Sequence, residues 1–163
     1  DLNLFYEDWR ATFSASPKYV LSFVAVFFVK SGGFVMSAVR DSFNRINNLA
    51  FAGRFYEHLL ATDAKMKEKF KHTDFKKQKE ALLGGIYVLI EYSEGGAIGQ
   101  VSINRLSEKH NRSNMDVPAD LYPIWVDCFI QAVSEMDPRF SPDLETQWRK
   151  TLKPGIDKMI AEY

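Results

Sequence analysis

The sequence predicts an all-α fold of about seven or eight helices. After Gly33, apolar residues recur at intervals of three and four along most of the chain, which is the spacing of one helical face. Glycine pairs, prolines and short polar runs separate these segments and are typical of helix ends. No stretch alternates apolar and polar residues for long enough to predict a strand.

Residues 1–33 differ from the main domain that we expect over residues 34–163. Ser16 and Pro17 suit the start of a helix, with Ser as the N-cap and Pro at the first helical position. Residues 19–29 are almost entirely apolar, but this run is well short of the roughly 20 residues that span a bilayer. A helix that is apolar on all sides must be buried. We therefore expect an additional N-terminal helix, covered partly by the main domain and partly by a second copy or another domain.

The main domain is expected to open with two helices and a short charged segment. The second helix covers residues 49–61, and the charged segment covers residues 63–70. The first helix is indicated by apolar residues at i, i+4, i+8 and i+11, which are Val35, Val39, Phe43 and Ile46.

Two further helices and a loop are expected in the middle of the chain. One helix begins after Asp74, whose carboxylate suits the N-cap position. It ends near Gly95 and Gly96, because glycine just past a helix stops it. Residues 98–112 form the next helix, and residues 111–118 form a polar loop.

The last two predicted helices are apolar on one face. Residues 121–136 form the first of them. Ser141 caps the second, with Pro142 at its first position. Its apolar positions are Leu144, Trp148, Leu152, Ile156 and Ile160.

Composition excludes several classes of function. Lys and Arg together number 21, as do Asp and Glu, so the formal net charge is zero. A nucleic-acid-binding protein would need a basic excess, and so would a protein held on membranes by a polybasic segment. The single cysteine, Cys128, cannot form an internal disulfide or a multi-cysteine zinc site. We expect a cytoplasmic protein without a transmembrane segment, whose metal chemistry would depend on carboxylates or on His58, His72 and His110.

Several segments, in this order and spacing, resemble bacterial globins. The run FYEHLLATDAKMKEKF, residues 55–70, is similar to the second helix and following corner of bacterial globins and flavohaemoglobins. The run HTDFKKQKEALLGGI, residues 72–86, resembles the start of their distal helix, and LSEKH, residues 106–110, resembles their proximal motif. Residues 116–133 resemble the next helix, and Trp148 lies where the last helix usually has Trp.

The resemblance implies a three-over-three helical sandwich that binds haem b. In it, His110 is the iron ligand, Phe70 stacks on the haem, and Tyr56 and Gln78 form the distal polar pair. The other haem contacts that it implies are Leu82 on the distal side and Leu106, Val117 and Tyr122 on the proximal side. Bacterial members often pair the last of these with a Glu late in the final helix, and no clear equivalent is found before Tyr163.

The residue chemistry agrees with these implied roles but leaves alternatives. A proximal histidine must be neutral, with its second ring nitrogen donating to an acceptor, and a backbone carbonyl near Leu106 lies one turn earlier. His110 could otherwise be an exposed helical histidine, and Tyr56 and Gln78 could be ordinary structural residues. Phe70 and Leu82 would also suit any helical core.

The resemblance implies a globin, of single-domain or sensor type, that reversibly binds oxygen, NO or CO as a carrier, store or gas sensor. One alternative is a haem enzyme, either an NO dioxygenase or a peroxidase-like protein, that needs an external reductase. A second alternative is a haem-free interaction module. We expect a gas-binding protein rather than an enzyme.

Overall fold

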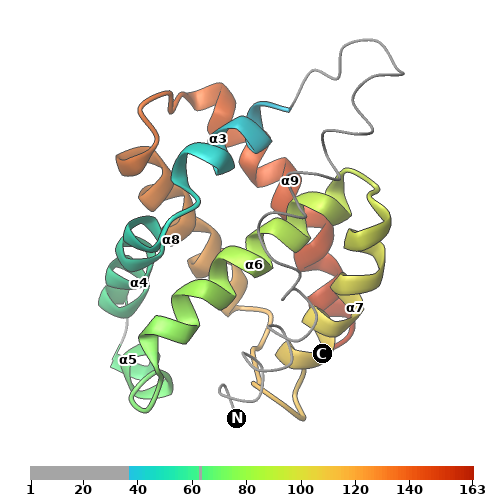
Figure 1. Ribbon diagram of the computed structural model, residues 1–163. Helices are drawn as coiled ribbons and strands as arrows, with labels where there is room; N and C mark the ends of the chain where they lie inside the picture. The colour runs from blue at the N-terminus through green and yellow to red at the C-terminus, as the bar shows by residue number, and fades with distance from the viewer. Residues whose placement is uncertain (1–36, 63) are drawn as a thin grey trace.

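The computed structural model describes residues 37–62 and 64–163, which form helices and loops without any strand. This confirms the all-α prediction (Figure 1). The predicted N-terminal helix, its partner surface and the boundary at residue 33 lie outside the described residues. The helices are α3 (Ala38–Ile46), α4 (Leu49–Thr62), α5 (Ala64–Lys69), α6 (Phe75–Ser93), α7 (Ala97–His110), α8 (Leu121–Met136) and α9 (Pro142–Ala161).

Polar side chains cap several helices where the sequence indicates. The Asp74 carboxylate accepts a hydrogen bond from the backbone N–H of Lys76 at 3.0 Å and begins α6. The Ser141 hydroxyl accepts from the backbone N–H of Leu144 at 3.1 Å and begins α9. Gly95, at a φ of 76°, has the left-handed conformation that favours glycine and lies just after α6.

One element differs from its prediction. Residues 63–70 are expected as a charged segment, but residues 64–69 form the short helix α5. Its sequence, AKMKEK, contains good helix formers, and the buried Met66 packs into the core. Because every second residue of this segment is a lysine, the segment has no apolar periodicity that could indicate a helix.

The helices pack in two crossed layers around one core. Helix α6 packs against α7 and α9, while α4 packs against α8 (Figure 1). The arrangement is the three-over-three helical sandwich that the resemblance to bacterial globins implies. None of the helices within the described part of the chain is long and apolar enough to cross a membrane.

A buried polar cluster links α3 to α9 and to the residue that follows α8. The Ser42 hydroxyl donates to the Asp137 carboxylate at 2.6 Å and accepts from the indole N–H of Trp148 at 3.0 Å. Arg45 adds two hydrogen bonds to Asp137, at 2.7 and 2.8 Å. Burial opposes ionisation of Asp137, but these donors and the Arg139 N–H outweigh it and lower its pKa to about 2.

Two glycines allow close packing around α6. A Cβ at Gly99 would overlap the backbone of Glu91 and Tyr92, so α7 can approach the end of α6 only without a side chain there. A Cβ at Gly155 would likewise overlap the side chain of Leu89, where α9 crosses α6. These contacts fix α6 and α7, which form two walls of the cavity described next.

Candidate functional site

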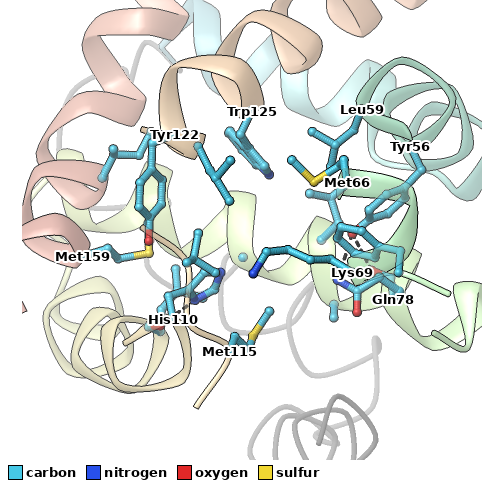
Figure 2. Close-up of a pocket in the computed structure, with 18 of the residues that line it drawn as sticks. Tyr56, Leu59, Met66, Lys69, Gln78, His110, Met115, Tyr122, Trp125 and Met159 are labelled. Carbon is cyan, nitrogen blue, oxygen red and sulfur yellow. Dashed lines mark hydrogen bonds between the residues drawn. The ribbon is translucent and has the colours of Figure 1, made fainter. Parts of the chain in front are cut away.

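A cavity of about 380 Å³ lies between the layers, within the range of small-ligand pockets (Figure 2). Most of its lining is apolar. It is enclosed by residues from all the described helices except α3, and by the loop between α7 and α8. The structure brings all eight predicted site residues to this cavity, namely Tyr56, Phe70, Gln78, Leu82, Leu106, His110, Val117 and Tyr122. Their roles in binding a cofactor stay predictions.

His110 lies at the end of α7 with its imidazole in the cavity (Figure 2). Its Nδ1 lies 2.8 Å from the backbone oxygen of Leu106, which fixes Nδ1 as the donor and leaves a lone pair on Nε2. Desolvation lowers the pKa of His110, and the bond to Leu106 only partly offsets this effect. The imidazole is therefore neutral at neutral pH, as a metal ligand must be.

Tyr56 and Gln78 lie across the cavity from His110 (Figure 2). The Gln78 amide donates to the Tyr56 hydroxyl at 3.0 Å, whereas the hydroxyl is 3.5 Å from the backbone oxygen of Gln78. Burial raises the pKa of Tyr56 well above its ordinary value, although the bond from Gln78 lowers it. Tyr56 is therefore a neutral hydroxyl that accepts one good hydrogen bond, while its own proton makes only the long contact with the backbone oxygen of Gln78 and can move to another partner.

Aromatic neighbours hold the Tyr56 ring in place. The ring packs edge-on against Phe55, Phe70 and Phe75, with centroid distances of 5.0, 5.7 and 5.5 Å. Phe55 also contacts Trp125, which lines the cavity from α8. Phe70 thus contacts the Tyr56 ring and also lines the cavity itself.

Tyr122 has a buried hydroxyl without a hydrogen-bond partner among the described residues. Its side chain lies on the His110 side of the cavity (Figure 2). Burial raises the pKa of Tyr122 to about 12, so the group stays protonated. Glu162, an acidic residue near the end of the chain, is not the partner of Tyr122, because its carboxylate forms an ion pair with Lys158 at 2.6 Å. A buried hydroxyl without a partner indicates that a water or a ligand completes the site.

Several residues that line the cavity were not predicted from the sequence. Ala81 and Gly85 follow Gln78 by three and seven positions, so helical spacing could have identified them. Because their side chains are small, they leave space in the cavity along this side of α6. A Cβ at Gly85 would make one ordinary van der Waals contact, with the side chain of Leu106 at 3.9 Å, so a methyl group could be accommodated there. The other missed residues depend on tertiary packing and include Met66, Lys69, Asn114, Met115, Trp125 and Met159.

The other two histidines lie outside the cavity. His58 places its Nε2 3.1 Å from the Glu135 carboxylate on the surface, and His72 is exposed. One neutral imidazole therefore faces a tyrosine–glutamine pair across an apolar space. These residues fit an iron porphyrin, which needs one axial imidazole, apolar walls for the ring and room on the opposite side.

Comparisons with known proteins agree with this arrangement. The sequence model of the Globin family matches residues 53–159. Among solved structures, the chain is similar to protein PA3967 from Pseudomonas aeruginosa PAO1, which is described as structurally highly homologous to a human hemoglobin. The two sequences are 30% identical over 77% of this chain and 95% of that chain, with a TM-score of 0.71. No curated protein sequence matches. The predicted similarity to flavohaemoglobins is not among these findings and stays a prediction.

Proposed function

Because this chain belongs to the globin family, we propose that its cavity binds haem b and, with it, reversibly binds oxygen or another diatomic gas. The observation that carries the proposal is the neutral His110 imidazole facing the Tyr56 hydroxyl across an apolar cavity. Haem iron would supply the coordination chemistry, and the chain's residues would hold the haem and tune its ligand affinity.

His110 is the proposed axial ligand. Its Nδ1–H is engaged by the Leu106 carbonyl, so only Nε2 can bind a metal. The next loop is anchored to the same residue, because the backbone N–H of Val117 donates to the carbonyl of His110 at 3.1 Å. These two hydrogen bonds fix the imidazole and the loop relative to each other, which supports a defined ligand position.

Tyr56 is the proposed donor to the bound gas, and Gln78 is a positioning residue. Gln78 gives its amide hydrogen to Tyr56, which orients the hydroxyl and polarises its O–H bond. The hydroxyl can then donate to a ligand atom that carries partial negative charge. Oxygen bound at ferrous haem carries such a charge and CO carries little, so this arrangement favours oxygen.

Haem reconstitution with matched histidine variants tests the proposal. The purified protein is titrated with haem, and ferric, ferrous and CO-bound absorption spectra are recorded. The wild type and His72→Ala, which alters an exposed histidine, should both give a Soret band. His110→Ala should lose stable haem, and His110→Gly should regain a ligated spectrum when imidazole is added.

Two results would contradict this assignment. A normal ferrous-CO spectrum in His110→Ala would exclude His110 as the ligand. A wild-type protein without any Soret change would favour the haem-free interaction module instead. Retention of the folded state in each variant is checked by circular dichroism.

A further inference from the structure

The first turns of α7 have an exposed apolar surface. Ile98 and Val101 are 52% and 66% exposed, the two largest values for large apolar side chains among the described residues. They lie one turn apart on the helix, and the exposed Ala97 lies beside them. We call these three residues the α7 patch. Adjacent apolar side chains that are this exposed favour a surface that another segment covers.

The buried face of α7 points away from the patch. Gly99 packs so closely against the end of α6 that a Cβ there would overlap the backbone of Glu91 and Tyr92. Ile103 is 1% exposed and belongs to the core. The helix is therefore held in the fold by its other side, and the described residues leave the α7 patch uncovered.

The described part of the chain begins beside this patch (Figure 1). The Ser37 hydroxyl donates to the Glu94 carboxylate at 2.9 Å, and Arg40 forms ion pairs with Glu94 and Glu91. These contacts hold the start of α3 against the end of α6. Since Glu94 and Ala97 are three positions apart, their Cα atoms are separated by at most about 11 Å. The residues that precede Ser37 therefore join the fold close to the α7 patch.

The sequence before Ser37 contains a segment that suits this surface. Residues 19–29, YVLSFVAVFFV, are almost entirely apolar and include no charged residue, so they match a patch that is itself apolar and uncharged. The run ends eight positions before Ser37, and eight residues can span at most about 28 Å. The connection is therefore long enough for the run to reach the α7 patch of its own chain.

We propose that residues 19–29 dock on the α7 patch of the same chain. A connection of this length gives the segment an effective concentration in roughly the millimolar range. Docking within one chain should therefore outcompete docking on a second copy at ordinary protein concentrations. The inference does not depend on haem binding, because neither the patch nor the segment contributes to the cavity.

Hydrogen exchange of the full chain, followed by mass spectrometry, tests the proposal. The variants Ile98→Asp and Val101→Asp each place a charge in the α7 patch. Leu49→Asp is the matched control, because Leu49 is a 46% exposed aliphatic residue in the first turn of another helix. Asp is tolerated near helix N-termini, so all three variants should fold, and circular dichroism checks this.

Backbone amides of residues 19–29 should be protected in the wild type. Exchange of this segment should be about 5- to 10-fold faster in each α7 variant, the factor expected when burial of the exposed half of one aliphatic side chain is lost. Leu49→Asp should resemble the wild type. Protection should not change over a roughly 100-fold range of protein concentration, because docking within one chain is independent of mass action.

A second measurement uses the accessibility of a thiol at the patch. Val101→Cys and Leu49→Cys are each prepared in the full chain, and alkylation is followed by mass spectrometry; the native Cys128 is buried. Position 101 is more exposed than position 49 among the described residues, so without a docked segment Val101→Cys should react at least as fast. Docking of residues 19–29 should reverse this order.

Three results would overturn the proposal. The first is a wild type whose residues 19–29 exchange without protection. The second is unchanged protection in both α7 variants, or equal loss in Leu49→Asp, since either would place the segment elsewhere. The third is protection that rises with protein concentration, which would assign the α7 patch to a second copy of the chain.

Discussion

Replacing Tyr56 with Phe removes one oxygen atom from the wall of the cavity opposite His110. The ring should keep its place, because it packs against Phe55, Phe70 and Phe75. The substitution therefore tests the hydroxyl and not the shape of the site.

The magnitude follows from the hydrogen bond that is lost. Tyr56 is 4% exposed, and Gln78 already supplies the bond that its oxygen accepts. Its remaining bond, to a partly charged oxygen ligand, is worth about 1.5–3 kcal/mol. At about 1.4 kcal/mol per decade, oxygen should dissociate roughly 10–100 times faster from Tyr56→Phe. CO dissociation should change far less, because bound CO carries little charge.

Rapid-mixing measurements of oxygen and CO dissociation from the ferrous protein provide the assay. Tyr87→Phe is the matched control, since Tyr87 is half-buried on the same α6 helix as Gln78 but does not line the cavity. It should leave both rates unchanged. Equal acceleration of both gases in Tyr56→Phe would refute the reasoning, because it would show a steric role for Tyr56.

Two further predictions concern the core and the shape of the cavity. Asp137→Asn should lower the free energy of unfolding by about 2 kcal/mol at neutral pH, measured by urea denaturation, because the folded-state pKa is about 2 against an ordinary 3.8. Since this pKa is depressed, ionised Asp137 stabilises the folded state above its ordinary pKa, and the difference from the wild type should vanish as the pH falls toward 2; a difference independent of pH would contradict this origin. Gly85→Leu should abolish haem uptake while the thermal melting point of the haem-free protein is kept or raised, because position 85 lines the cavity and its Cβ would meet Leu106 without overlap. Full haem uptake by this variant would show that the ring lies elsewhere.

Helix positions could be predicted from local patterns, because capping and apolar spacing act within a few residues. Asp74 and Ser141 begin helices as expected. The contact of His110 with Leu106 is also local, since the two residues lie one turn apart on α7. The placement of Tyr56 beside Gln78 came from the family resemblance, because no local rule brings α4 to α6.

The missed features depend on distant parts of the chain. Ser42 and Asp137 are 95 positions apart, and neither has a neighbour in sequence that indicates their contact. Lys69 reaches the cavity because α5 ends beside the loop after α7. The path of that loop is set by hydrogen bonds such as those from Met115 to the carbonyl of Lys109 and from Asp116 to that of Asn111. Loops of this kind have no periodic apolar pattern from which their path could be predicted.

The acceptor for His110 has a consequence for its electronic character. A carboxylate partner would draw the Nδ1 proton away and make the imidazole a strong electron donor, as suits cleavage of an O–O bond. Here the acceptor is the peptide oxygen of Leu106, which is neutral and does not titrate. The donor strength of His110 is thus set by the main chain. Because this acceptor does not titrate, the contact does not make the donor strength of His110 depend on pH. Replacing the side chain at position 106 would leave the accepting backbone oxygen in place.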